Sequence, residues 1–349
     1  MNQQNKNNPL PKKRHSRTVL IWTLGIIVLL MSLTFITMQL SPWPSAMLIR
    51  YGFNKGGKAT NLALEPFVPQ GIARQLNIPY TNTSNPDTKL DIYSPATVKG
   101  DSGTFPVIVW IHGGAWLAGS KEYVGNYCKI LAGKNYIVAA INYSLAPAST
   151  YPTQLFQVNQ AIAFLKKNAW KYNIDPSRFI LAGDSGGAQV AAQMAGVISN
   201  RDYAREINIE PSLSNTELAA TLLYCGAYDF SLITLKGSSA WFLKTVLWSF
   251  TGDKHFSNNP AFNSISITKK VTVAFPPTFI SVGNDDPLAI HSHALAARLN
   301  SLGVKVDSLF FTKDHQPALP HEYQFNLNGK DGQLALQKSL QFLSEQVKR

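Results

Sequence analysis

Short apolar runs that alternate with amphipathic stretches constrain the fold of this chain more than any other feature. Six runs, each rich in Val, Ile, Phe or Tyr and bounded by turn residues, cover residues 105–112, 136–143, 178–185, 220–229, 276–283 and 304–311. Between them lie stretches with apolar residues at helical spacing, most clearly Leu155, Val158, Ile162 and Leu165. Strands that alternate with helices predict a mostly parallel central sheet with helices on both faces.

Some segments depart from this alternation. Residues 72–81 and 88–95 are strand-like with no helical stretch between them, which predicts an antiparallel hairpin at the edge of the sheet. Residues 231–270 intervene between two strands and indicate either an ordinary buried helix or a cap that lines a pocket. Their aromatic residues are Trp241, Phe242, Trp248, Phe250 and Phe256. Residues 41–71 are apolar and turn-rich, so we expect them to pack on the domain as part of the same cap.

The N-terminal segment contains 23 residues without a charge, from Thr18 to Leu40. About 20 apolar residues suffice to cross a bilayer as a helix, so this segment predicts a transmembrane anchor. The basic residues in positions 1–17 place that end in the cytoplasm, which leaves the catalytic domain outside it, in the periplasm if the source is a Gram-negative bacterium. A cleaved signal sequence is the main alternative, although residues 41–46 are poor for cleavage, and a buried core helix is the third.

The net charge of +12 raises the question of a nucleic-acid partner. Five of the 32 basic residues lie in the first 17 positions, which leaves 27 basic against 20 acidic residues in the rest. No basic stripe interleaved with aromatic residues follows, so the composition argues against nucleic-acid binding. The 349 residues suffice for one large domain, which we place at residues 72–349, with the cap insertion at about 231–270.

Cysteine and histidine spacing argues against a metal site. Cys128 and Cys225 occur in no CxxC or other metal-ligand spacing, and the sequence leaves open whether they form a disulfide or stay as two buried thiols. His291 and His293 are two positions apart at a predicted helix start, so they do not share a face and are expected to be solvated. The sequence predicts neither a metal nor a cofactor.

The strongest chemical signal is the GxSxG run Gly183-Asp184-Ser185-Gly186-Gly187, which directly follows an apolar strand and directly precedes a helical stretch. A serine at such a sharp turn adopts a strained backbone conformation that requires small residues two before and two after it. Gly183 and Gly187 meet that need, and the following helix N-terminus favours negative charge beside the serine. Ser185 is therefore the predicted nucleophile.

A second signal is the run from His112 through Gly113, Gly114 and Ala115 to Trp116, at the end of a predicted strand. Glycines let backbone N–H groups approach a substrate oxygen closely. The N–H groups of Gly113, Gly114 and Gly186 are the predicted oxyanion hole. The Ala115 N–H is the alternative to that of Gly113.

The triad acid and base should follow later strands. Asp286 is the predicted acid and its neighbour Asp285 the alternative, because both lie in the turn after an apolar strand. The base lies in the loop after the next strand, where His321 is preferred to His315 because more loop lets it reach Asp286. The resulting order of Ser, Asp and His along the chain is that of α/β hydrolases and differs from that of trypsin-like or subtilisin-like enzymes.

At these motifs the sequence resembles the hormone-sensitive-lipase-like esterases, in their bacterial branch. The HGG turn, the segment from Asn142 to Pro152, the GDSGG elbow, the turn at residues 284–288 and the late HEY run carry the resemblance, which covers about residues 72–345. It implies the α/β-hydrolase fold, a cap built from the N-terminal segment and an insertion, and ester hydrolysis without a cofactor. Ala115 replaces the family's usual third glycine, and GDSGG replaces the commoner GDSAGG, which bears on substrate preference.

These observations together predict a carboxylesterase or lipase-type serine hydrolase for short to medium acyl chains. His321, oriented by Asp286, would take the proton of Ser185 as that residue attacks an ester carbonyl. A small-molecule ester and, through residues 18–40, a lipid bilayer are the expected partners. An amidase or peptidase on the same triad, or a catalytically silent binding domain tethered to a membrane, are the alternatives.

Overall fold

A computed structural model describes residues 14–95, 103–258 and 260–347. The chain divides into two compact units, Met1–Ser45 and Ala46–Arg349. The first contains helix α1, Arg14–Leu40, and the start of helix α2, Trp43–Ala63. Most of the basic residues assigned to a cytoplasmic N-terminus, including Lys6, Lys12 and Lys13, lie outside the described residues.

Helix α1 contains the whole uncharged segment Thr18–Leu40, whose most apolar 18-residue stretch has a mean hydropathy of 2.6. At 1.5 Å per residue it extends about 35 Å, enough for a hydrocarbon core of about 30 Å. None of this segment is buried, so the third interpretation, a buried core helix, is wrong. Length and apolarity are properties that anchors and signal sequences share.

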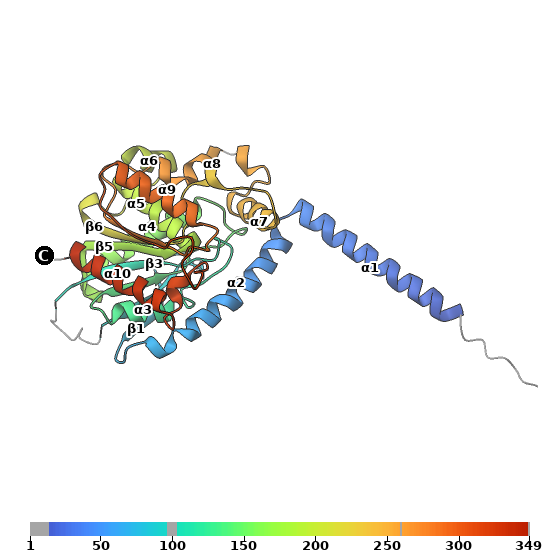
Figure 1. The fold of residues 1–349 in the computed structure, drawn as a ribbon, viewed down its shortest axis with the longest axis horizontal. Coiled ribbons are helices and arrows are strands. Elements are labelled where there is room, and N and C mark those ends of the chain that lie inside the picture. The colour runs from blue at the N-terminus through green and yellow to red at the C-terminus, as the bar shows by residue number, and fades with distance from the viewer. Residues whose placement is uncertain (1–13, 96–102, 259, 348–349) are drawn as a thin grey trace, which may run out of the picture. The chain divides into compact units, whose positions relative to one another are not determined.

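The second unit is built on an eight-stranded sheet in the order β1-β2-β4-β3-β5-β6-β7-β8 (Figure 1). Its strands are β1 Ala73–Pro79, β2 Lys89–Ser94, β3 Phe105–Ile111, β4 Ile137–Ile141, β5 Ile174–Asp184, β6 Leu218–Tyr224, β7 Thr278–Val282 and β8 Val306–Phe310. The pairs β1/β2 and β2/β4 are antiparallel and the other five are parallel. The predicted parallel sheet and its antiparallel edge hairpin are both confirmed.

Helices cover both faces of this sheet, as the alternation predicts (Figure 1). The helices after the first strand are α3 Gly125–Ala132, α4 Thr153–Lys167, α5 Ser185–Ser199, α6 Arg201–Ile207, α7 Ala240–Thr251, α8 Pro260–Ile265, α9 Ala289–Ser301 and α10 Lys330–Gln346. Alternate residues of β3 face different cores: Val107 and Val109 pack with α4, α5 and α9, whereas Ile108 and Trp110 pack with α3 and α10. Burial on both faces explains why the strand runs are continuously apolar.

Residues 41–71 differ from the expectation of a turn-rich segment, because Trp43–Ala63 is one continuous helix. One of its three glycines packs closely, since a Cβ at Gly57 would lie 3.1 Å from the ring of Tyr123, whereas Gly52 and Gly56 face open space. Arg50 also donates hydrogen bonds to the carbonyl oxygens of Leu117 at 2.5 Å and Ala146 at 2.8 Å. Such tertiary contacts override the weak helix propensity of glycine.

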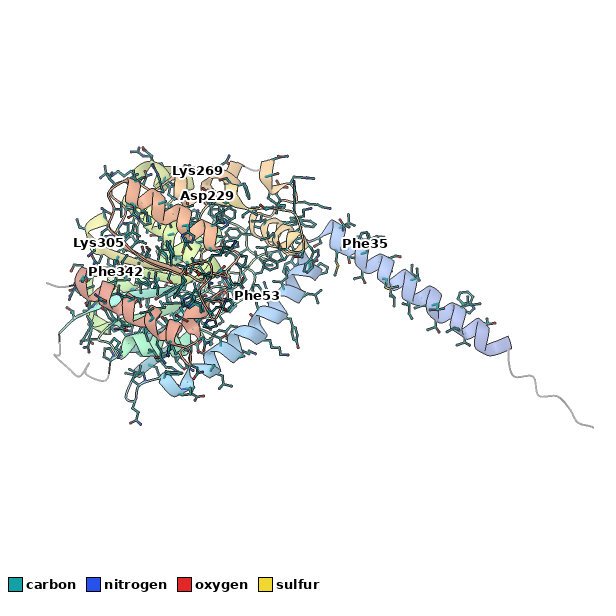
Figure 2. The ribbon with its side chains drawn as sticks, in the orientation of Figure 1. Phe35, Phe53, Asp229, Lys269, Lys305 and Phe342 are labelled. Atoms are coloured by element: carbon teal, nitrogen blue, oxygen red, sulfur yellow. The ribbon has the colours of Figure 1, made fainter. Side chains whose placement is uncertain are left out.

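The insertion at 231–270 contains α7, α8 and the short 3-10 helices Phe256–Asn258 and Ile267–Lys269. Both interpretations of its aromatic residues hold in part. Phe250 is fully buried in the core, whereas Trp241 is exposed. Phe53 of α2, which is labelled in Figure 2, packs against Phe242 of α7, and their ring centroids are 5.8 Å apart. The insertion and α2 therefore contact each other.

A buried charge lies near the edge hairpin. The Lys121 side chain is only 1% exposed, and its Nζ lies 2.9 Å from Asp91 Oδ1 and 2.9 Å from Asn77 Oδ1. Glu122 Oε1 is 2.6 Å away on the solvent side. Removal of one partner of such a buried pair leaves an uncompensated charge in the protein interior.

We therefore expect Asp91→Ala to lower the free energy of unfolding by about 3 to 5 kcal/mol. Denaturation of the full chain in mild detergent, followed by tryptophan fluorescence, measures this change. Asp202→Ala is the matched control, because its ion pair with Arg205 is exposed and should contribute little. Equal effects of the two substitutions would contradict the role assigned to the buried pair.

Candidate active site

The turn between β5 and α5 has the geometry that its glycines imply. Ser185 adopts a left-handed backbone conformation with φ 52° at the first position of α5. A Cβ at Gly183 would lie 2.6 Å from the Ile111 carbonyl oxygen, and one at Gly187 only 2.0 Å from the same atom. Neither position can hold a side chain unless β3 moves, so the two glycines let the strained serine turn pack against the sheet.

The side chains of Ser185, His321 and Asp286 form a continuous hydrogen-bonded chain. His321 Nε2 lies 2.9 Å from Ser185 Oγ, and His321 Nδ1 lies 2.8 Å from Asp286 Oδ2. These residues follow β5, β8 and β7, whose carboxyl ends meet at one edge of the parallel sheet. The structure thus brings together the three residues that the sequence selects as nucleophile, base and acid.

The two alternatives lie elsewhere. Asp285 is exposed, and its N–H donates to the Leu319 carbonyl oxygen. His315 packs its ring 4.7 Å from that of Phe311 and places Nε2 3.3 Å from Asp331 Oδ1. His315 and His321 thus lie at different places in the loop of residues 311–323. Of the two, only His321 contacts Ser185.

The expectation that both His291 and His293 are solvated is wrong for His291. It is buried, and its Nδ1 accepts a hydrogen bond from the Asp229 N–H at 3.2 Å. His293 is exposed and packs against Phe310. The helix start at α9 points one histidine into the core and the other outward, because residues two apart face different sides of a helix.

The surroundings of His321 shift its affinity for a proton. Burial lowers the pKa of His321, whereas contacts with Cys225 and Asp286 raise it, and the net pKa lies well above its ordinary value. Asp286 Oδ1 also accepts the Leu288 N–H at 2.7 Å, which fixes the carboxylate. The hydrogen bond from His321 Nδ1 to Asp286 thus favours the charged form of the imidazole.

Cys225 is a neighbour of His321 that the sequence does not reveal. It lies directly after β6 with φ 46°, and burial raises the pKa of its thiol. Cys225, Asp286 and His321 each place one potential metal ligand atom within 4.8 Å of the others. The His321 Nδ1 in this group is already bonded to Asp286. Both cysteines are buried free thiols, so the disulfide alternative is not formed.

Residues His112–Trp116, here called the oxyanion loop, differ from the sequence prediction at Gly113. The Gly113 N–H donates to Asp184 Oδ2 at 2.8 Å, so this group is not free to receive a substrate oxygen. Three residues with positive φ follow, namely Gly114 at 113°, Ala115 at 52° and Trp116 at 60°. Among the described residues, no acceptor engages the N–H groups of Gly114, Ala115 or Gly186.

Aromatic contacts hold the oxyanion loop in place. Trp116 Nε1 donates to the Gly186 carbonyl oxygen at 3.0 Å, and its ring stacks on Phe250 of α7 with centroids 4.2 Å apart. Tyr143 Oη donates to the His112 carbonyl oxygen at 2.7 Å. Burial lowers the pKa of His112 to about 4, so its imidazole is neutral at neutral pH. The cap insertion therefore contacts the loop through Phe250.

Asp184 and Glu322 are further site residues that the sequence reasoning did not assign. Asp184 is buried and accepts hydrogen bonds from Trp110 Nε1 at 2.9 Å and from the Gly113 N–H. Burial and the nearby Glu322 carboxylate raise the pKa of Asp184 well above its ordinary value. The only sequence signal for these two residues was their position, since Asp184 precedes Ser185 and Glu322 follows His321.

Comparisons with known proteins connect this site to hydrolases. The model of the family described as BD-FAE matches residues 90–299. A putative α/β hydrolase of Acanthamoeba polyphaga mimivirus is 29% identical over 218 residues, which is 60% of each chain. Esterase LipQ of Mycobacterium tuberculosis is 29% identical over 236 residues, covering 66% of this chain and 54% of the relative. The chain thus spans little more than half the length of these relatives.

Solved structures show the same fold. An inhibited esterase B from Lactobacillus rhamnosis has a TM-score of 0.73 at 19% identity, covering 86% of this chain and 96% of that one. A bacterial heroin esterase has a TM-score of 0.63 at 20% identity, covering 86% and 94%. These likenesses identify the α/β-hydrolase fold of the second unit.

The geometry predicts that His321 controls the reactivity of Ser185 and that His315 does not. A fluorophosphonate probe should label the wild-type chain at Ser185. His321→Ala should slow this labelling by about four orders of magnitude, because the hydroxyl loses its base. His315→Ala should keep most of it. With both variants shown to be folded by circular dichroism, the reverse pattern would refute the assignment.

Proposed function

The chain belongs to the BD-FAE family of α/β hydrolases, and we propose that it hydrolyses carboxylic esters through an acyl-enzyme on Ser185. The observation that carries this proposal is the hydrogen-bonded chain from Ser185 through His321 to Asp286. Relatives named as esterases, among them carboxylesterase NlhH of Mycobacterium tuberculosis at 26% identity over 245 residues, agree with the resemblance to hormone-sensitive-lipase-like esterases.

In the proposed reaction, Ser185 Oγ attacks the ester carbonyl carbon while His321 Nε2 takes its proton. The new oxyanion accepts hydrogen bonds from backbone N–H groups, and the intermediate then expels the alcohol, which receives the proton from His321. Water, deprotonated by the same imidazole, attacks the acyl carbon; the bond to Ser185 Oγ then breaks, His321 returns the proton to Oγ, and the carboxylic acid is released. Asp286 keeps the imidazole oriented and stabilises its charged form.

The oxyanion donors proposed here are the N–H groups of Gly114, Ala115 and Gly186, in place of the set that included Gly113. The Gly113 N–H instead serves the loop, because its bond to Asp184 holds the oxyanion loop against the serine turn. One donor in such a site typically contributes about 3 kcal/mol of transition-state stabilisation. The placement of the oxyanion loop should therefore affect the rate of ester hydrolysis.

Short to medium acyl chains fit the aromatic surroundings of the site. Trp116, beside the serine turn, stacks on Phe250 and lies 5.9 Å from Phe230, measured between ring centroids. Phe230 in turn contacts Phe262 of α8 at 5.6 Å. Two of these four rings, Phe250 and Phe262, belong to the cap insertion, and the group should limit the length of the acyl chain.

The same residues could cleave an amide, since the attack on the carbonyl does not depend on the leaving atom. A catalytically silent fold is disfavoured by the intact contacts at Ser185. A phosphonate probe separates the silent fold from an active enzyme, and a matched ester and amide separate the two activities.

We also propose that α1 is an uncleaved anchor and that the catalytic domain lies outside the cytoplasm. The support is the apolar segment Thr18–Leu40, preceded by five basic residues in the first 17 positions. An anchored enzyme would meet its substrate at or near a membrane.

We expect kcat/KM to be higher for p-nitrophenyl butyrate than for p-nitrophenyl palmitate, because the aromatic cap limits the pocket. The full chain in mild detergent is assayed across the acyl series, with Ser185→Ala as the control that should lose turnover. Faster hydrolysis of long-chain emulsions than of butyrate esters would count against the proposed chain length.

We expect the chain to remain in the membrane fraction after alkaline carbonate extraction, because a 23-residue apolar helix holds it there. Protease added to the outer side should reach the catalytic domain. Mass spectrometry of the intact chain checks whether residues 1–40 are retained. Release into the soluble fraction with a processed N-terminus would refute the anchor.

A further inference from the structure

The outward face of α2 carries an unusual row of side chains. Leu48, Tyr51, Lys55, Lys58 and Leu62 recur at spacings of three and four residues and are all exposed. The exposed fractions are 59% for Leu48, 74% for Tyr51 and 66% for Leu62. At 3.6 residues per turn these five positions form one stripe along the helix, here called the outer stripe.

The opposite side of α2 is fixed to the domain, so the outer stripe cannot rotate inward. Ile49 is buried in the core, and Arg50 donates to two backbone carbonyl oxygens. Asn54 Oδ1 accepts the Gly119 N–H at 3.0 Å, and Asn61 Oδ1 accepts the Asn126 N–H at 2.8 Å. These contacts hold the apolar side chains of the outer stripe in solvent unless something else covers them.

The charges of the N-terminal residues indicate which kind of surface covers the apolar side chains of the outer stripe. The first 64 residues contain eight basic residues and no acidic residue. Within the outer stripe, neither Lys55 nor Lys58 forms an ion pair with any residue of the described ranges. Helices that lie in a membrane interface have this composition: leucine and tyrosine side chains alternate with unpaired lysines, and acidic residues are absent.

The position of α2 along the chain agrees with this composition. Only Ser41 and Pro42 separate the apolar segment from the first residue of α2. Two residues extend over about 10 Å at most between the flanking Cα atoms. If Leu40 lies at the edge of a bilayer, the first turn of α2 must therefore lie close to its headgroups.

We propose that the outer stripe of α2 lies on the surface of an anionic lipid bilayer. Leu48, Tyr51 and Leu62 enter the boundary between headgroups and acyl chains, and Lys55 and Lys58 lie among the lipid phosphates. The inference rests on the proposed anchor, which holds α2 at the membrane. A second copy of the chain fits less well, because a two-fold contact centred on the stripe would bring the lysines of both copies together with no acidic residue in the stripe to compensate them.

The bilayer contact would also bear on the active site. Arg50 donates to the carbonyl oxygen of Leu117, which directly follows the oxyanion loop, and Asn54 accepts the N–H of Gly119 two residues later. A membrane that holds the outer stripe therefore supports the helix whose inner side braces this loop. Esters that partition into the bilayer are the substrate class that such an arrangement favours.

The test places a fluorophore on the outer stripe of the full chain, reconstituted in vesicles of phosphatidylcholine and phosphatidylglycerol. Cys128 and Cys225 are buried, so a maleimide dye should react selectively with an introduced exposed cysteine. Leu48→Cys and Leu62→Cys probe the outer stripe. Val273→Cys is the matched control, because Val273 is an exposed apolar residue, 74% accessible, between two elements far along the chain from α2.

We expect the dyes at positions 48 and 62 to shift to shorter wavelength and to be quenched by lipids that carry a nitroxide just below the headgroup. The dye at position 273 should show neither effect. Lys55→Glu combined with Lys58→Glu should reduce the quenching at position 48 by about half or more, because lysine attraction to anionic lipid is lost.

Three results would overturn the inference. The first is that the chain resists carbonate extraction but the dyes at positions 48 and 62 are no more quenched than the dye at position 273. This result would refute the bilayer contact and leave the anchor intact. Dyes at position 48 that quench each other between chains, without quenching by lipid, would assign the outer stripe to a second copy. Release of every variant from the vesicles by carbonate would refute the anchor and the bilayer contact together.

Discussion

The hydrogen bond from the Gly113 N–H to the buried Asp184 carboxylate joins the two loops on which the site depends. Asp184 immediately precedes the nucleophile, and Gly113 begins the turn that leaves the next N–H groups unpaired. A Cβ at Gly113 would lie 2.3 Å from Asp184 Oδ2, so only glycine allows this contact. The same carboxylate accepts from Trp110 on β3, which ties both loops to the sheet.

The parallel sheet explains why distant residues meet. Neighbouring parallel strands end at the same edge, so the loops after β5, β7 and β8 bring Ser185, Asp286 and His321 together although 136 positions separate the serine from the histidine. The histidine loop needs a further constraint because it is long. Tyr323 supplies one, since it is buried and its Oη lies 2.5 Å from Ser281 Oγ on β7.

The segments outside the sheet act on the site through contacts with the oxyanion loop. Phe250 of the insertion stacks on Trp116, and Arg50 of α2 bonds to the carbonyl oxygen of Leu117. The insertion and α2 therefore both hold residues in or beside the oxyanion loop. A helix that begins two residues after an apolar span can in this way link a membrane contact to the geometry of a backbone turn.

The sequence by itself determined the strands, the edge hairpin, the apolar segment and the serine turn, because periodicity and glycine spacing are local properties. It also restricted the acid and the base to Asp285 or Asp286 and His315 or His321. Only the tertiary structure decided that the Gly113 N–H is taken by Asp184, that Cys225 lies beside His321, that His291 is buried, and that residues 43–63 form one helix. Each of these depends on contacts between residues far apart in the chain, and no local pattern records which partner a backbone N–H or a side chain will meet.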